Sequence, residues 1–135
     1  MTCIIWEKEH ELGIKEIDEQ HKKLIEIMNH LCETINSGKE NYFVDEILDD
    51  LRDYAMAHFQ TEEKYFIEFK YEDAEEHRKQ HNKFFSALKL FKRDLDIGEE
   101  HVAKELTEFL ENWLFNHMMK YDKKYVECFH KNGLY

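Results

Sequence analysis

Residues 44–62 read VDEILDDLRDYAMAHFQTE, and this stretch decides the fold of the chain. Its apolar side chains recur at alternating steps of three and four residues: Val44, Ile47, Leu51 and Tyr54. The same steps lead to His58, and Glu62 follows one turn later. Such spacing is typical of one face of an amphipathic helix. We therefore predict a helix whose buried face carries an imidazole and a carboxylate.

Three other stretches repeat this pattern of an apolar stripe that ends or begins in metal-ligand-type residues. Their members are His21 with Leu24, Met28, Leu31 and Ile35; His77 and His81 with Phe84, Leu88, Phe91 and Leu95; and Leu106, Leu110 and Trp113 with His117 and, five residues later, Asp122. We predict helices near residues 18–37, 41–68, 73–96 and 100–130, preceded by an irregular arm over residues 1–17.

The breaks between these stripes are short. Gly38 and Gly98 each follow a stripe and are expected to end a helix, and Asp73 is expected to cap the next one. Four amphipathic helices with short connections predict an all-α fold, an up-down-up-down four-helix bundle. We expect residues 1–135 to form a single domain.

Composition limits the function classes. A formal net charge of −11 argues against nucleic-acid binding or binding to an anionic membrane. No apolar run is long enough for membrane insertion, and no secretory signal is visible. Three cysteines without C-x2-C spacing, Cys3, Cys32 and Cys128, are interpreted as reduced thiols of a cytoplasmic protein, with Cys32 a small core residue.

Five histidines and two carboxylates on buried faces would be costly to bury unless a cation accompanies them. The candidate metal ligands are His21, His58, Glu62, His77, His81, His117 and Asp122. Residues four apart share a helical face, so His58 with Glu62 can serve one small volume. Asp122 lies about 140° round an α-helix from His117, which suits a carboxylate that reaches toward a second ion.

The number of ligands favours two ions. Two octahedral ions offer about twelve positions. Five histidines, two bridging carboxylates and one solvent-derived oxo or hydroxo bridge would fill eleven of them. One open position is expected, on one ion of an asymmetric pair, and an open position is typical of a reactive site. Imidazole and carboxylate without thiolate suit iron, manganese or zinc.

Alternative readings are weaker. The remaining histidines, His10, His30, His101 and His130, fall off the buried faces or outside the helices, so we expect them on the surface. A zinc peptidase would need His-Glu-x2-His, which is absent. Ferritin-like di-iron proteins use Glu-x2-His pairs, and such pairs occur only near the two chain ends, outside the core pattern.

The order His, His-x3-Glu, His-x3-His, His-x4-Asp resembles the hemerythrin family, and within it the single-domain bacterial form. The likeness runs nearly the length of the chain. It includes Ile17-Asp18-Glu19-Gln20-His21, His58-Phe59-x2-Glu62-Glu63 and Trp113-Leu114-x2-His117. One departure is Glu72 after Tyr71, where relatives often place proline. That difference affects a turn and leaves the candidate ligands unchanged.

The resemblance implies two iron ions with an oxo or hydroxo bridge. His77, His81 and His117 would hold one iron, His21 and His58 the other, and Glu62 with Asp122 would bridge them. The iron with two histidines would keep the vacancy and bind dioxygen reversibly. An apolar oxygen pocket would keep water out, with candidates Leu24, Phe59, Trp113, Leu114 and Met118. For each of these, an ordinary core role is an equally good interpretation.

These implications predict a non-enzymatic oxygen-binding protein for storage, delivery or sensing. A di-iron oxidase or reductase acting on oxygen, peroxide or nitric oxide is the alternative, because the same vacancy would serve it. A sensing or partner-binding module is a third possibility, although these residues include no output domain. The expected partner is dioxygen, and we expect a monomer.

Overall fold

The structure is a computed structural model that describes residues 3–135, and those residues contain helices and turns but no strand. The long helices are α1 (Lys15–Asn36), α2 (Glu40–Glu68), α3 (Ala74–Asp96) and α4 (Val102–Trp113), and α4 continues through η2 (Leu114–Asp122) into α5 (Lys123–Lys131). The predicted helices are confirmed within about three residues, which is the usual precision of such boundaries.

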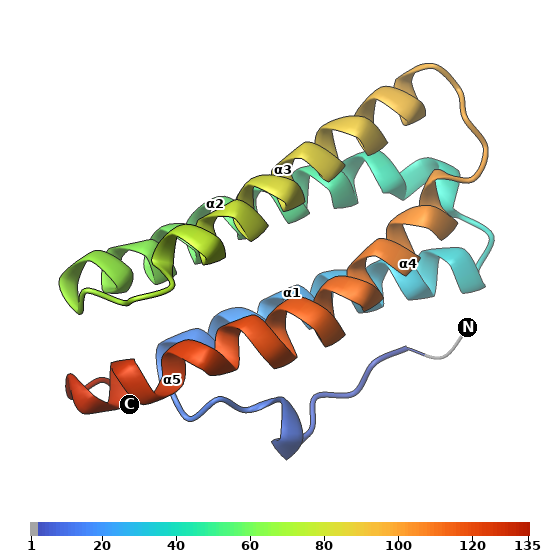
Figure 1. Cartoon of the computed structure of the whole chain (residues 1–135). Helices are drawn as coiled ribbons and strands as arrows, with labels where there is room; N and C mark the ends of the chain where they lie inside the picture. Colours follow the sequence, from blue (N-terminus) through green and yellow to red (C-terminus); the bar gives the residue numbers. More distant parts are fainter. Residues whose placement is uncertain (1–2) are drawn as a thin grey trace.

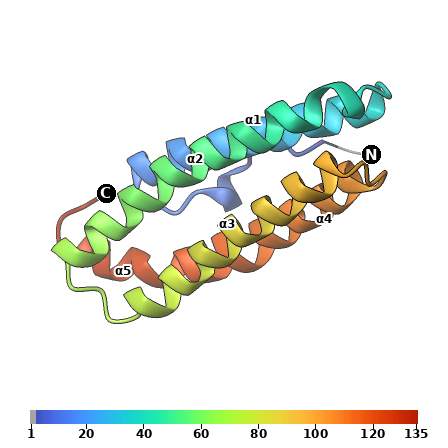
Figure 2. The same ribbon diagram turned by 90° about the horizontal axis from the view of Figure 1, so that it is seen from above.

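The elements form a four-helix bundle in which each helix lies against the next one along the chain. α1 packs on α2, α2 on α3 and α3 on α4, and α4 closes the bundle against α1 (Figure 1). The view from above shows α1 beside α2 and the α4–α5 rod running back along α3 (Figure 2). The predicted up-down-up-down architecture is confirmed.

Two glycines end their helices by the same backbone device. After α1, the amide of Gly38 bonds to Ile35 O and that of Lys39 to Thr34 O. Gly38 has a φ of 68° and Gly98 one of 85°, in the left-handed region where glycine is favoured. The pair of bonds after α1 is a Schellman motif, and α3 ends in the same way. Asp73 precedes α3 as predicted, but its side chain makes no capping hydrogen bond.

The N-terminal arm runs along α1 and the α4–α5 rod (Figure 1). Residues 1 and 2 of the predicted arm lie outside the described part of the chain. The arm contains a short 3-10 helix, η1 (Lys8–His10), and joins α1 where Asp18 accepts hydrogen bonds from the Leu12 and Gly13 amides at 2.7 and 3.2 Å. Asp18 therefore lies inside α1 and ties the end of the arm to its first turn.

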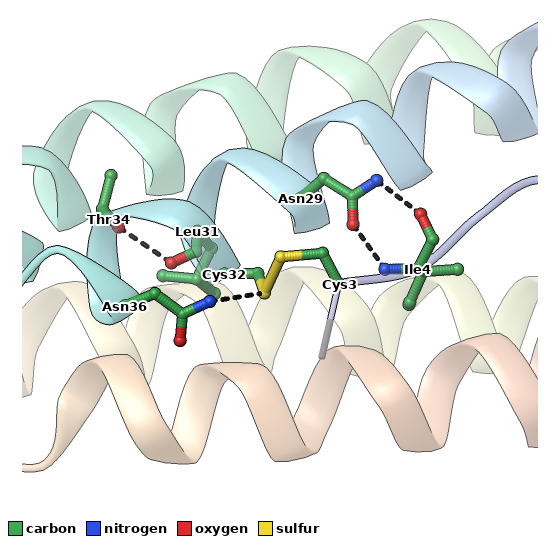
Figure 3. The surroundings of a disulfide bond; sticks show 7 residues. All are labelled: Cys3, Ile4, Asn29, Leu31, Cys32, Thr34 and Asn36. Atoms are coloured by element: carbon green, nitrogen blue, oxygen red, sulfur yellow. Dashed lines mark hydrogen bonds between the residues drawn. A yellow bond between two sulfur atoms is a disulfide. The ribbon is translucent and has the colours of Figure 1, made fainter. Parts of the chain in front are cut away.

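Cys3 and Cys32 form a disulfide between the arm and α1, with their Cα atoms 5.7 Å apart (Figure 3). The prediction of three reduced thiols is therefore wrong for this pair, although Cys32 is buried as expected and Cys128 is free. The arm folds back along α1, and that tertiary contact brings together two cysteines whose spacing in the sequence suggests no bond.

Among the other histidines, the prediction for His10 is also wrong. Its side chain is buried, its Nδ1 accepts a hydrogen bond from the Glu7 amide at 2.9 Å, and its ring lies beside Trp6. His101 is exposed as predicted, whereas His30 and His130 are half-buried. His130 Nε2 lies 2.9 Å from the carbonyl oxygen of Gly13.

The buried apolar residues form two clusters. The larger one extends from Leu24 and Phe59 to Leu106, and the smaller one contains Ile17 and Phe66. None of the described helices is long and apolar enough to cross a membrane. Most of the predicted ligands lie in sequence between a member of the larger cluster and a member of the smaller one, as His21 does between Ile17 and Leu24.

Candidate metal centre

All seven predicted ligands lie together at the centre of the bundle, and each is at most 3% exposed. Their ligand atoms form two groups, in each of which the atoms lie within 4.8 Å of one another: Glu62, His77, His81 and His117; and His21, His58, Glu62 and Asp122. Glu62 belongs to both. One group has three imidazoles and the other has two.

The Glu62 carboxylate faces both groups. Its Oε1 lies 2.9 Å from His81 Nε2 and 3.7 Å from His77 Nε2, which belong to the first group. The same oxygen lies 3.4 Å from His58 Nε2, which belongs to the second. His58 and Glu62 are four residues apart on α2, so both project from one helical face.

The two carboxylate oxygens of Asp122 face histidines of different ligand groups. Oδ2 lies 3.0 Å from His21 Nε2, while Oδ1 lies 3.1 Å from the Nε2 atoms of both His77 and His117. A carboxylate in this position can contact an ion on either side. Glu62 and Asp122 are thus the two residues whose placement suits a bridge.

The approach of His117 to Asp122 depends on a change in helix geometry. Residues Leu114–Asp122 form a π-helix, in which hydrogen bonds run from i to i+5. Residues five apart are then much less offset around the helix than they are in an α-helix. The predicted offset of about 140° assumed an α-helix, and that geometry is wrong here. The π-helix lets the side chains of His117 and Asp122 both enter the cluster from the same helical rod.

The cluster is not satisfied by its own hydrogen bonds. Several buried polar atoms lack a hydrogen-bond partner: Nε2 of His21, His58, His77 and His117, Oε2 of Glu62, and both carboxylate oxygens of Asp122. Many of these atoms lie close to one another yet lack hydrogen-bond geometry. Buried polar atoms are normally paired, and cations among these nitrogens and oxygens would satisfy them. The residues present therefore fit a two-metal centre.

The charges of the cluster also favour a cation. Burial and mutual repulsion oppose ionisation of Glu62, but the neighbouring imidazoles hold its pKa below the ordinary value, and the pKa of Asp122 is lowered in the same way. Burial lowers the pKa of His58 to about 4, because Glu62 offsets the loss of solvent only in part. Two carboxylates thus stay ionised in the core beside imidazoles that include a neutral His58.

The imidazole of His77 lies beside both carboxylates of the cluster, and they determine its protonation. Burial lowers its pKa, but the adjacent carboxylates of Asp122 and Glu62 raise it more, to about 10. A proton on this ring supplies part of the positive charge that the two carboxylates require. Metal binding demands a neutral imidazole, so an ion would take the place of that proton.

Two histidines make hydrogen bonds to polar residues that lie outside the cluster. His58 Nδ1 lies 2.5 Å from Gln20 Oε1, and His81 Nδ1 lies 3.0 Å from Glu63 Oε2. Outer partners of this kind fix the tautomer of a metal-binding histidine. No role is predicted for Gln20 or Glu63 from the sequence pattern alone. Each adjoins a predicted ligand in the chain, and that adjacency was the available signal.

Two of the five predicted oxygen-pocket residues stack on ligand rings. Phe59 stacks on His81 with ring centroids 3.7 Å apart, and Trp113 stacks on His117 at 3.9 Å. Both aromatic rings therefore cover histidines of the three-imidazole group. The remaining three candidates are buried in the larger apolar cluster: Leu24, Leu114 and Met118.

A surface hollow of about 480 Å³ approaches the other group. It lies between α1 and α2, and its lining includes Gln20, Tyr54 and His58. The two-imidazole group is thus the one that lies beside this hollow, while aromatic rings cover the three-imidazole group.

A helical bundle with such a centre defines a metal-binding four-helix protein, and comparison with known proteins names the family. Residues 12–129 match the family model described as "Hemerythrin HHE cation binding domain". The chain belongs to the hemerythrin family.

Curated relatives and a solved structure agree with this assignment. The chain is 34% identical over 128 residues to a bacteriohemerythrin of Pseudomonas aeruginosa (strain LESB58), covering 95% of the chain and 82% of the relative. It is 30% identical over 130 residues to a bacteriohemerythrin of Clostridium acetobutylicum, covering 91% and 98%. A crystal structure of wild-type hemerythrin superposes with a TM-score of 0.83 at 29% identity, covering 94% of this chain and 98% of that one.

Proposed function

We propose that this protein binds dioxygen reversibly at a non-heme di-iron centre. His77, His81 and His117 would hold one iron, and His21 and His58 the other. Glu62 and Asp122, with an oxo or hydroxo bridge, would join them. The observation that carries the proposal is the pair of overlapping ligand groups with three imidazoles in one and two in the other, sharing Glu62.

The imbalance of imidazoles is what provides a binding position. An ion with one histidine fewer would keep room for a small exogenous ligand, whereas an ion held by His77, His81 and His117 would have no open position. When bound, two ferrous ions supply the electrons for reversible dioxygen binding. The hollow beside Gln20 and His58 lies next to the two-imidazole group, where that position would be.

The apolar residues would protect the bound oxygen. Water or protons that reached it would promote its loss and leave inert ferric iron. We assign this protection to the predicted pocket. Phe59 and Trp113 stack on His81 and His117 and would cover the three-imidazole side, so the cover over the vacancy would come from the other members, which are buried in the larger apolar cluster. These members are Leu24, Leu114 and Met118. Because these side chains carry no ionisable group, none of them can act as an acid or base toward the bound molecule.

Reversible absorption tests the proposal. Protein loaded anaerobically with ferrous iron is expected to gain a charge-transfer band in air, to lose it under vacuum and to regain it in air. His58→Ala should lose the band, while His101→Ala, which alters an exposed histidine outside the cluster, should keep it. An air-stable ferric protein without a reversible band would overturn the proposal. Steady consumption of a reductant with oxygen would instead support the oxidase or reductase alternative.

We further propose a monomer that acts in the cytoplasm without nucleic-acid or membrane partners. The formal net charge of −11 supports the absence of anionic partners. Persistent disulfides are rare in the cytoplasm, so the Cys3–Cys32 bond is the feature of the structure that speaks against this compartment. Alkylation of rapidly acid-quenched cells tests this, and a pair that resists alkylation would point to an oxidising compartment. Sedimentation at equilibrium tests the monomer.

A further inference from the structure

The two sides of the metal centre differ in the groups that hold their histidines from outside. On the two-imidazole side, His58 Nδ1 meets the amide oxygen of Gln20 at 2.5 Å. On the three-imidazole side, His81 Nδ1 meets the carboxylate of Glu63 at 3.0 Å. One partner is neutral and the other is an acid, and this difference sets the two ligand groups apart.

The orientation of Gln20 follows from its other contact. Its Nε2 donates to Thr61 Oγ1 at 3.0 Å, and the Thr61 hydroxyl donates to the Ala57 carbonyl oxygen at 3.1 Å. Since Thr61 has given its hydrogen to that carbonyl, it can only accept from Gln20. The amide oxygen of Gln20 must then face His58 and accept from its Nδ1–H. The lone pair of His58 Nε2 is left to face Glu62.

The Glu63 carboxylate is positioned from α3. Its Oε1 lies 3.2 Å from Nε of Arg78, which also contacts Glu75, and its Oε2 faces His81. His81 thus has a carboxylate at each nitrogen, because its Nε2 lies 2.9 Å from Glu62. With a proton on Nδ1, the remaining nitrogen can bind a cation.

We propose that Gln20 and Glu63 are positioning residues that make the two ions unequal. A carboxylate that accepts the outer N–H of a ligating imidazole increases the basicity of that ligand, and a neutral amide does so less. The ion at His81 is therefore held more tightly and is the easier one to oxidise. The ion at His58 keeps the greater Lewis acidity and so the greater affinity for an exogenous ligand. This inference rests on the proposed two-metal function.

Cobalt binding tests the inequality without any oxygen chemistry. Metal-free protein titrated anaerobically with Co²⁺ is expected to bind two ions in two separate steps. Glu63→Gln should weaken the tighter step by about 10–100-fold and leave the other unchanged. Gln20→Glu should strengthen the weaker step. Glu46→Gln removes the same charge from an exposed position on α2 and should change neither step.

The midpoint potentials of the iron-loaded protein are a second readout. They would not change if Gln20 and Glu63 only supported the fold. Glu63→Gln should raise the midpoint potential of the first one-electron oxidation, and Gln20→Glu should lower one of the two potentials. Circular dichroism identifies a variant that fails to fold. If Glu63→Gln or Gln20→Glu does so, the remaining variant tests the proposal.

The outcomes separate the two proposals. Two equal cobalt steps in the unaltered protein, or variants that titrate and oxidise as the unaltered protein does, would overturn the inequality and leave the two-metal centre in place. Binding of no cobalt, or of one ion only, would contradict the two-metal function itself.

Discussion

The metal centre and the N-terminal arm are both assembled from residues that lie far apart in the chain, but the polypeptide completes only one of them. The arm is closed by the Cys3–Cys32 disulfide and by two hydrogen bonds between Asn29 and Ile4 (Figure 3). At the centre, the ligand nitrogens of His21 and His117 and both oxygens of Asp122 have no hydrogen-bond partner.

This difference shows where each region obtains its stability. The disulfide and the two Asn29 hydrogen bonds of the arm are complete without a ligand, so they contribute as soon as the chain is folded and oxidised. The centre buries ionised carboxylates beside imidazoles at a cost that only a cation can offset. We therefore expect metal to stabilise the bundle strongly and the arm contacts to add smaller, independent amounts.

Metal removal is expected to have the largest effect. Each ion present at about a thousandfold excess over its Kd contributes about 4 kcal/mol to the free energy of unfolding, so two ions contribute about 8 kcal/mol by the same relation. Urea denaturation of iron-loaded and chelated protein measures the difference. Adding ferrous iron back anaerobically should restore the original midpoint. Equal midpoints for the two forms would contradict a stabilising metal centre.

Loss of the disulfide should rank second. The bond links residues 29 apart in sequence, and closing a loop of that length is worth about 3–4 kcal/mol in the chain-entropy model. Cys3→Ser should lose this amount in urea denaturation and still bind two irons. Cys128→Ser, which removes the free cysteine, is the matched control and should change the stability little. A loss of iron in Cys3→Ser would show that the two regions are coupled.

Removal of the Asn29 side chain should have the smallest effect of the three. Its Oδ1 accepts from the Ile4 amide at 2.7 Å and its Nδ2 donates to the Ile4 carbonyl oxygen at 2.6 Å. Asn29→Ala should cost about 1–2 kcal/mol, since each net hydrogen bond contributes about 1 kcal/mol. Asn82→Ala, at an exposed position on α3, serves as the control. Equal unfolding free energies for both variants would mean that the two Asn29 hydrogen bonds do not hold the arm.

Much of the fold and of the centre could be predicted because α-helices repeat every 3.6 residues. The stripe through Leu51 and Tyr54 identified α2 and placed His58 and Glu62 on its buried side. His77 and His81, four residues apart, follow the same rule on α3. Periodicity therefore predicts which side chains enter the core whenever the helix keeps its regular geometry.

The remaining features depend on departures from that geometry or on tertiary contacts. The π-helix that carries His117 and Asp122 has a different repeat, so an offset computed for an α-helix does not apply. The Cys3–Cys32 bond and the burial of His10 arise where the irregular arm folds back onto the bundle. Gln20 and Glu63 contact histidines on neighbouring helices. Their adjacency to His21 and Glu62 in the chain places them near the centre, but it does not indicate which histidine each one contacts.

The positions of the metal ions test the central claim most directly. Crystals of the iron-loaded protein, measured at the iron absorption edge, should show two anomalous peaks per chain within the bundle. One peak should lie against the Nε2 atoms of His77, His81 and His117, the other against those of His21 and His58, with Glu62 and Asp122 between them. A single peak, or peaks outside the seven residues, would contradict the account.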